Sequence, residues 1–249
     1  MSSFGDHFSK QARAYARYRP HYPSELFVYL ASIAPSRQLA WDCGTGNGQA
    51  ARELVKHFQR VIATDASLDQ VAQAAAHERI DYRVERAEEA SLEIGSVDLV
   101  TVAIAVHWFD LESFYQTVRR VAVARGILAV WTYHLPVIEP AIDQVLAHYY
   151  TNVLAGYWPE RFHYVAERYR TLPFPFAELD PPEMEMQTDW ELGDLVGFLE
   201  SWSATQRYQQ ERGHHPVSVI WPMLTETWGD PRQRRHIRWP LYLRVGEIR

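Results

Sequence analysis

Short apolar runs alternate with amphipathic stretches between residues 38 and 133, and this alternation predicts strands followed by helices. The predicted strands cover 39–41, 61–64, 80–84, 97–103 and 126–133, and the helices between them cover 49–58, 68–76 and 111–123. The run 97–103 shows no polar alternation beyond Asp98, as expected for a strand that helices cover on both faces. Repeated units of this kind predict an α/β fold with a Rossmann-like, doubly wound and mostly parallel sheet.

The segments outside this core predict further helices and two more strands. Before the core, helices are predicted over 9–17 and 24–34, with Ser24 as the N-cap of the second. After the core, helices are predicted over 140–154, 160–169, 192–212 and 217–227, a proline-rich run spans 172–182, and strands cover 183–188 and 236–245. We expect the last strand to be antiparallel, and Pro240 within it indicates an edge position or a bulge.

These elements predict four parts along the chain. Residues 1–37 form an N-terminal helical segment, and residues 38–135 form the Rossmann-like core. Residues 136–230 form an inserted helical lid and substrate region, with one core strand near 183–189. Residues 231–249 supply the closing core strand.

Composition and charge narrow the class of protein. With 249 residues, 47% of them hydrophobic, the chain can bury a substantial core as one large domain with insertions or a small cap. A net charge of −6 gives no electrostatic reason to expect nucleic acid or an anionic membrane as a partner. The longest apolar stretch, 97–109, is too short to span a bilayer, and the first residues lack the pattern of a signal peptide. We therefore expect a cytoplasmic protein that is a monomer or a weak homodimer.

The metal-ligand residue types are sparse. Cys43 is the single cysteine, which excludes an intramolecular disulfide and a cysteine-based zinc cluster. His214 and His215 are adjacent, but no third ligand stands at a suitable spacing. We expect no metal site.

Three glycines, Gly44, Gly46 and Gly48, follow the first predicted strand and precede a helix, where glycine permits positive φ and close approach to a ligand. Their spacing is G-x-G-x-G, whereas a dinucleotide site uses G-x-G-x-x-G to place a pyrophosphate on the helix N-terminus. The charge of Asp42 would repel a pyrophosphate and suits a ligand with an ammonium and a sulfonium. Asp65 ends the second strand, where a carboxylate can accept hydrogen bonds from both hydroxyls of a ribose.

Two sets of motifs resemble known enzymes. Residues 42–48 (DCGTGNG), Asp65 and residues 96–100 (SVDLV) resemble the class I S-adenosylmethionine-dependent methyltransferases. Residues 8–23, with the pattern F-x-x-x-A-x-x-Y-x-x-x-R-P-x-Y-P, and residues 107–110 (HWFD) resemble the type 11 branch related to trans-aconitate methyltransferase. The resemblance covers residues 4–133 and is diffuse beyond them.

The resemblance implies S-adenosylmethionine as the cofactor, bound at the ends of the predicted strands beneath an N-terminal segment that closes over it. The implied cofactor-binding residues are Asp42, Gly44, Thr45, Gly46 and Gly48 in the first turn, Asp65 for the ribose, Ala66 and Leu68 for the adenine, Ala87 and Glu88 at the adenine edge, Ala105 beside the sulfonium, and Tyr22 in the N-terminal segment. The sequence departs from the family pattern twice. Arg86 stands where many relatives have an acid that bonds the adenine amino group, and residues 124–126 (ARG) replace the usual Pro-Gly-Gly turn.

Methyl transfer from a sulfonium is an in-line displacement, in which the protein contributes mainly alignment and electrostatics. A general base is needed only where the acceptor has a proton to lose. His107, after the fourth predicted strand, is the candidate catalytic residue, and a structural histidine is the alternative. The candidate substrate-binding residues are Arg19, Trp108, Tyr133, His134, Trp202 and Arg207. Core packing and surface ion pairs are the alternative roles for these side chains.

The sequence thus predicts an S-adenosylmethionine-dependent methyltransferase that acts on a small molecule, at a carboxylate or hydroxyl oxygen. Two alternatives stay open at this point: a protein that binds S-adenosylmethionine without transferring methyl, and an NAD(P)-dependent oxidoreductase on a similar sheet. A nucleic-acid methyltransferase is disfavoured, because residues 106–109 (VHWF) lack the Asn/Asp-Pro-Pro-aromatic motif of such enzymes.

Overall fold

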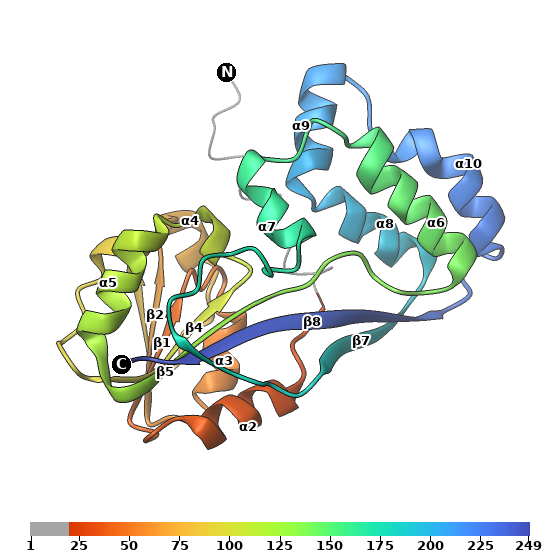
Figure 1. Cartoon of the computed structure of the whole chain (residues 1–249). Helices are drawn as coiled ribbons and strands as arrows, with labels where there is room; N and C mark the ends of the chain where they lie inside the picture. The colour runs from red at the N-terminus through yellow and green to blue at the C-terminus, as the bar shows by residue number, and fades with distance from the viewer. Residues whose placement is uncertain (1–19) are drawn as a thin grey trace. The chain divides into compact units, whose positions relative to one another are not determined.

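The computed structural model describes residues 20–249, so the predicted helix over 9–17 lies outside the described residues (Figure 1). The chain divides into two compact units. The first, here called the sheet unit, contains Tyr22–Tyr133, Tyr164–Met184 and Leu241–Arg249. The second, here called the helical unit, contains His134–His163 and Glu185–Pro240.

An open sheet organises the first unit. Its parallel strands are β1 (Leu39–Cys43), β2 (Arg60–Asp65), β3 (Ile80–Val84), β4 (Val97–Ala103) and β5 (Ala122–Thr132). They are followed by β8 (Arg235–Glu247), antiparallel to β5, and by β6 (Ala177–Leu179), antiparallel to β8. The strand order is β3-β2-β1-β4-β5-β8-β6, and β7 (Met184–Trp190) pairs with β8 off this path. The predicted doubly wound, mostly parallel sheet with an antiparallel last strand is confirmed.

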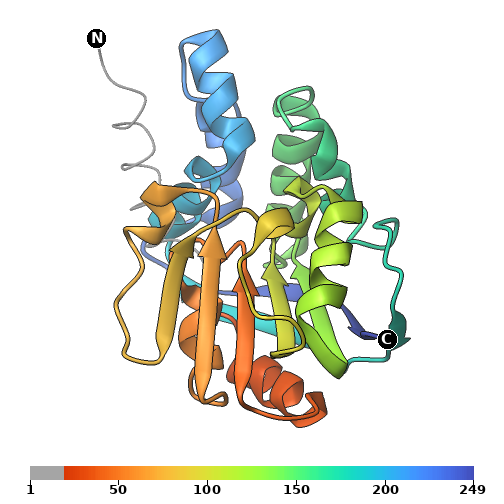
Figure 2. The same ribbon diagram turned by 90° about the vertical axis from the view of Figure 1, so that its left-hand side faces the viewer.

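Helices cover both faces of the parallel strands. The helices are α2 (Ser24–Ile33) and α3 (Gln49–Leu54) on one face and α5 (Leu111–Val121) on the other (Figure 1). In α5 the buried residues Phe114, Val118 and Val121 recur at helical spacing, so one face of the helix packs on the sheet. The parallel strands point toward one edge, where α4 (Leu68–Val71), η1 (Ala87–Glu89) and η2 (Val106–Trp108) follow them (Figure 2).

Asp98, in the motif SVDLV, holds the start of β1. The side chain is 3% exposed. One carboxylate oxygen accepts the N–H groups of Gln38 and Leu39 at 2.9 and 3.0 Å, and the other accepts the Ser36 hydroxyl at 2.8 Å. This acid therefore joins β4 to the residues that begin β1, which is a structural role.

The turn that replaces Pro-Gly-Gly is built around a left-handed arginine. Between β4 and β5 the pairing shifts from Val97 with Ala122 to Leu99 with Ile127, which leaves a bulge over 123–126. Arg125 lies in this bulge with φ +63°, a backbone conformation that residues other than glycine rarely adopt. Its guanidinium pairs with Glu247 at 3.1 Å.

The helical unit is made of short helices around an aromatic core. They are α6 (Pro140–His148), the π-helix η3 (Tyr149–Val153), η4 (Glu160–Phe162), α8 (Leu192–Glu200), α9 (Ser203–Arg212) and α10 (Val217–Trp228), and α7 (His163–Ala166) follows η4. The Trp202 ring lies 5.8 Å from Tyr149, 5.6 Å from Trp158 and 5.6 Å from Phe198, centroid to centroid. Across residues 20–249, no helix has both the length and the apolar character that crossing a membrane requires.

Several predicted helices are shorter than expected, and for two of them the structure shows the cause. The prediction of one helix over 192–212 is wrong, because the chain breaks at Ser201 and Trp202. There the Ser201 hydroxyl donates to the Phe198 carbonyl at 2.6 Å and the Thr205 hydroxyl donates to the Leu199 carbonyl at 2.8 Å, so side chains take over the last carbonyls of α8. The helix predicted over 68–76 ends at Val71, since most of the alanines after it face solvent and offer no apolar face to bury.

Two local predictions are also corrected. Ser24 is the first residue of α2 and not its N-cap, which is Pro23, and the Ser24 hydroxyl donates to the Glu25 carboxylate instead. The proline-rich run also contains the short strand β6, which the sequence did not predict. Proline is depleted in strands, and three paired residues are too few for a periodic pattern.

Candidate active site

The glycine turn at the end of β1 is held by the backbone of β2. The Thr64 carbonyl accepts the N–H groups of Gly44 and Thr45 at 2.8 and 2.9 Å. Gly44, Gly46 and Gly48 have φ values of +70°, +56° and +83°, so each glycine is required by a left-handed backbone. A Cβ on Gly44 would lie 2.6 Å from the Ala105 Cβ, so this turn closely approaches the loop that follows β4.

Asp42, just before the turn, is an interior residue. It is fully buried, and its two carboxylate oxygens accept the hydroxyls of Thr45 and Thr101 at 2.6 and 2.9 Å. Burial raises the pKa of Asp42 to about 6, against the opposing effect of these hydrogen bonds. The carboxylate thus links the glycine turn, through Thr45, to β4, through Thr101. The placement of Asp42 along the methionine part of the cofactor stays a prediction.

Asp65, at the end of β2, links two loops of the same edge. One oxygen accepts the Gly46 N–H at 2.9 Å and the other accepts the Ser67 N–H at 2.9 Å. Each carboxylate oxygen has two lone pairs, so both can accept one more hydrogen bond. The side chain is partly exposed, which leaves it able to meet the hydroxyls of a ribose as predicted.

The residues predicted beside the adenine line the same edge. Leu68 is 66% exposed, and Ala66 is exposed next to Asp65. Ala87 is buried at the start of η1. The Glu88 carboxylate accepts the Asp110 N–H at 2.9 Å and lies 3.5 Å from the Arg86 guanidinium, so it ties η1 to the start of α5.

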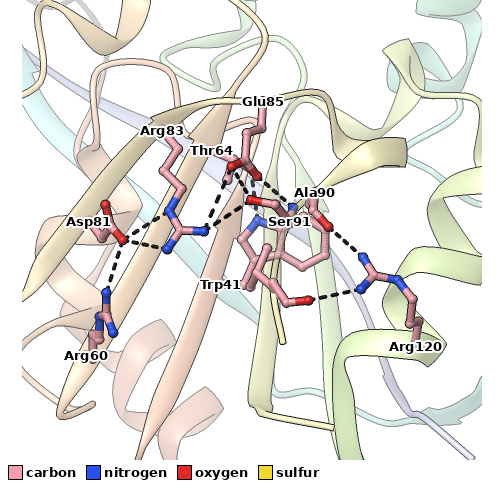
Figure 3. A network of polar contacts seen from close by, with 10 residues as sticks. Trp41, Arg60, Thr64, Asp81, Arg83, Glu85, Ala90, Ser91 and Arg120 are labelled. Atoms are coloured by element: carbon pink, nitrogen blue, oxygen red, sulfur yellow. Dashed lines mark hydrogen bonds and ion pairs between the residues drawn. The ribbon is translucent and has the colours of Figure 1, made fainter. Parts of the chain in front are cut away.

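A polar network supports the loop that carries η1. Figure 3 shows the Arg83 guanidinium between the Asp81 carboxylate, at 2.6 Å, and Glu85, at 3.9 Å. The Glu85 carboxylate in turn accepts the N–H and hydroxyl of Ser91 at 2.9 and 2.5 Å. Arg120 of α5 donates to the carbonyl of Ala90 (Figure 3). It also donates to the carbonyl of Leu92. These bonds fix the path of the chain between β3 and β4.

The loop after β4 begins with a strained residue. Ile104 has φ +53°, an unusual conformation for a β-branched side chain, and strain of this kind is concentrated at functional sites. Its N–H donates to the Trp131 carbonyl of β5 at 2.9 Å, which holds the distorted backbone in place. Phe109 packs on Phe114 with ring centroids 5.0 Å apart, whereas Trp108 is 48% exposed.

His107 lies within this loop and is buried. It is 2% exposed, and its Nδ1 lies 2.8 Å from the hydroxyl of Tyr169. Burial lowers the pKa of His107 to about 4, so the imidazole is neutral at neutral pH. A neutral imidazole bonded to a buried tyrosine agrees with the structural role that was the alternative to a catalytic base.

The predicted substrate residues fall in both units. Tyr133 and Trp108 belong to the sheet unit. Tyr133 is 6% exposed, whereas Trp108 is 48% exposed. His134, Trp202 and Arg207 belong to the helical unit, where Trp202 is 7% exposed in the aromatic core and Arg207 is exposed on α9. Arg19 lies outside the described residues, and Tyr22 packs edge-on against Trp131 of β5 at 5.4 Å.

Sequence reasoning missed several residues that shape this edge. Thr64 and Thr101 hold the glycine turn and Asp42, and Tyr82 of β3 lies against Gly48, where a Cβ would come within 2.4 Å of its hydroxyl. Thr101 could have been found from strand register, since Asp42 pairs with it across β1 and β4. Tyr169 carries no local signal, because its partner lies 62 residues away.

These features fit S-adenosylmethionine. The left-handed glycines of the turn allow a ligand to approach the backbone closely, because they have no side chain that would block it. Asp65 has acceptor capacity for ribose hydroxyls, and the exposed Leu68 offers an apolar surface for the adenine ring. Within residues 20–249, no cluster of three histidine, cysteine or acidic side chains is placed to hold a metal ion.

Comparisons with known proteins point to one family. The family described as a methyltransferase domain matches residues 41–130. A Dictyostelium discoideum protein named as a methyltransferase is 33% identical over 206 residues, covering 81% of this chain and 78% of that protein. A solved structure from Anaeromyxobacter dehalogenans, described as a type II methyltransferase, is 41% identical with a TM-score of 0.86 and covers 93% of this chain and 98% of that one. YcgJ of Bacillus subtilis shares the fold at a TM-score of 0.54 and 17% identity, over 91% of this chain and 99% of that one.

The fold and the glycine turn thus define a Rossmann-like methyltransferase domain. The chain belongs to the methyltransferase family that these relatives represent, as a class I enzyme that uses S-adenosylmethionine. The alternative of an NAD(P)-dependent oxidoreductase is therefore wrong, and the relatives support an enzyme rather than a protein that only binds the cofactor.

Proposed function

We propose that this enzyme methylates an oxygen atom, of a carboxylate or a hydroxyl, on a small molecule. The observation that carries the proposal is the loop after β4. Residues 104–109 contain one ionisable side chain, the buried and neutral His107, among apolar and aromatic neighbours. Such a surface suits a small organic acceptor, because apolar walls with few polar groups are typical of small-molecule sites.

The electrostatics also favour a small molecule over nucleic acid. The net charge is −6, and the loop after β4 has no lysine or arginine to neutralise a phosphate backbone. The exposed Trp108 offers an apolar wall for the acceptor, while Tyr133 follows β5 in the same unit. We assign substrate contacts to these two residues as part of the proposal.

The protein's own contribution to the reaction is alignment. When bound, S-adenosylmethionine supplies both the methyl group and the sulfur leaving group. Asp65 would hold the ribose, and the backbone of the glycine turn would lie along the methionine part. Because the Asp42 carboxylate is buried and held by two hydrogen bonds, it would provide a fixed negative charge for the ammonium of the cofactor's methionine part. The low dielectric constant of a buried site would strengthen this attraction.

Methyl-labelled S-adenosylmethionine tests the proposal. Purified enzyme is incubated with panels of carboxylic acids, alcohols, phenols, amines, RNA and protein, and transfer of label is counted. Alkali releases labelled methanol from methyl esters and leaves methyl ethers intact, so one step separates carboxylate from hydroxyl acceptors. Label in the oxygen acceptors supports the proposal, whereas label confined to amines, RNA or protein overturns it. The Asp65→Ala variant is the control for transfer that depends on the cofactor site.

A further inference from the structure

Tyr169 occupies a turn that the surrounding structure forces into an unusual shape. Arg168 and Tyr169 have φ values of +57° and +58°, a left-handed conformation that residues other than glycine rarely adopt. The turn is held by specific bonds: the Tyr169 N–H donates to the Tyr164 carbonyl at 2.7 Å, and Arg244 of β8 donates to the carbonyls of Tyr169 and Leu172. The surrounding structure thus holds this conformation from several sides, as is common at functional sites.

The result of this turn is a buried contact with His107. Tyr169 is fully buried, and its hydroxyl oxygen lies 2.8 Å from the Nδ1 atom of His107. The rings do not stack, since their centroids are 6.0 Å apart at an angle of 49°. The hydroxyl is therefore what couples the two side chains.

Within this hydrogen bond, the chemistry of the two groups favours Tyr169 as the donor. A phenol O–H is a better donor than a neutral imidazole N–H, and an imidazole nitrogen is a better acceptor than a phenol oxygen. Burial raises the pKa of Tyr169 and outweighs the opposing effect of a hydrogen bond with the Thr132 side chain, so the phenol keeps its proton. The lowered pKa of His107 keeps the imidazole neutral. Tyr169 then donates to Nδ1, and the single proton of the neutral ring stays on Nε2.

We propose that Tyr169 is a positioning residue, which fixes His107 in the tautomer with its proton on Nε2. The second ring nitrogen is then a hydrogen-bond donor, and His107 does not act as the general base. Where the proposed function holds, the acceptor oxygen attacks the methyl carbon, and the carbon–sulfur bond breaks with its electron pair on sulfur. A carboxylate acceptor has no proton to lose, and a hydroxyl acceptor would release its proton to water, so the proton count of His107 is unchanged in both cases. That consequence rests on the proposed function, whereas the tautomer does not.

Nitrogen NMR of the free protein tests the assignment. Histidine is labelled with ¹⁵N on the ring, and a His107→Gln variant identifies the His107 signals among those of the 11 histidines. In wild type we expect Nδ1 at the position of an unprotonated nitrogen and Nε2 at that of a protonated one. In Tyr169→Phe, which keeps the ring and removes the hydroxyl, we expect both signals to move toward averaged positions as the second tautomer becomes populated.

A second buried tyrosine provides the matched control. Tyr149 is also fully buried, and its hydroxyl bonds to Thr205 at 2.9 Å in the helical unit. Tyr149→Phe therefore removes a comparable hydrogen bond and should leave the His107 signals in place. A proton on Nδ1 in wild type overturns the proposal, as do unchanged His107 signals in folded Tyr169→Phe. If Tyr169→Phe does not fold, the wild-type spectrum still decides, and no cofactor or substrate enters the measurement.

Discussion

The Asp65 carboxylate accepts a hydrogen bond from the Gly46 N–H at 2.9 Å, so the acid that ends β2 holds the glycine turn that ends β1. Its second oxygen accepts the Ser67 N–H at the same distance and holds the next loop as well. Two loops that would both face the cofactor are thereby aligned by one side chain. Asp65 acts on the cofactor in two ways, through the shape of the turn and through its remaining lone pairs.

We expect Asp65→Ala to abolish tight cofactor binding and to leave the fold intact. The variant removes the acceptor for the ribose and for two backbone N–H groups, at a cost on the order of 1 kcal/mol in stability for each lost bond. Titration calorimetry with S-adenosylhomocysteine measures affinity, and urea unfolding measures stability. Unchanged affinity in a folded variant would show that the ribose assignment is wrong.

A ligand without ribose hydroxyls separates the two roles of Asp65. Wild type should bind dideoxy-S-adenosylhomocysteine more weakly than the parent compound. If Asp65 contacts the ribose directly, the variant should bind both ligands equally, because the hydroxyls have lost their partner. If the Asp65→Ala variant prefers the parent compound as strongly as wild type does, its loss of affinity comes from the altered turn alone.

Asp42 should make the protein less stable as the pH rises from about 4 to 6. Its pKa is about 6 in the folded protein against an ordinary value of 3.8, so the folded state binds more protons than the unfolded state in this window. The shift corresponds to about 3 kcal/mol of stability, present below the window and lost above it. Asp42→Asn should flatten this dependence and be more stable than wild type at pH 8, while binding the cofactor more weakly.

Calorimetric unfolding between pH 4 and 8 checks this expectation through the difference in the free energy of unfolding between wild type and Asp42→Asn. The other carboxylates titrate in both proteins, so their contributions cancel in this difference. Asp69→Asn, at an exposed position of α4, removes the same charge without a buried site and should track wild type. Parallel curves for Asp42→Asn and wild type would contradict the raised pKa.

Gly48→Ala should be more harmful than the same change at Gly213. Both glycines are left-handed, with φ values of +83° and +74°, so alanine costs roughly 1 kcal/mol or more at each. Only at Gly48 would the new Cβ lie 2.4 Å from the Tyr82 hydroxyl, whereas nothing lies within 4 Å at Gly213. Overpacking should add about 1–3 kcal/mol at Gly48. Chemical denaturation of both variants gives the difference, and equal losses would refute the close contact.

Arg125→Gly should stabilise the protein relative to Arg125→Ala. Both variants lose the ion pair with Glu247, which contributes little because the arginine side chain is 78% exposed. Only glycine adopts the left-handed backbone at φ +63° without strain. The net gain in the free energy of unfolding is about 1 kcal/mol, because the greater entropy of glycine in the unfolded state offsets part of the relieved strain. The two midpoints in urea provide the comparison, and a less stable glycine variant would show that the turn is not strained.

The accuracy of the sequence-based prediction depended on whether a signal was local. The strands β3 and β4 were predicted at their observed bounds, because an apolar run between polar turns reflects burial directly. The helix over 192–212 was predicted without its break, since the bonds of Ser201 and Thr205 to the end of α8 depend on the fold of that corner. The glycine turn was recognised because positive φ restricts residue type at each position.

The sequence by itself determined the parallel sheet, the glycine turn, the methyl donor and the acid that ends β2, because periodicity and glycine spacing encode burial and backbone shape within short segments. Only the tertiary structure decided that Asp42 is buried between Thr45 and Thr101, that Asp65 braces two loops, and that Tyr169 bonds His107. These relations join residues up to 62 positions apart. Such contacts depend on how the strands align and the loops return, which no local pattern of polar and apolar residues specifies.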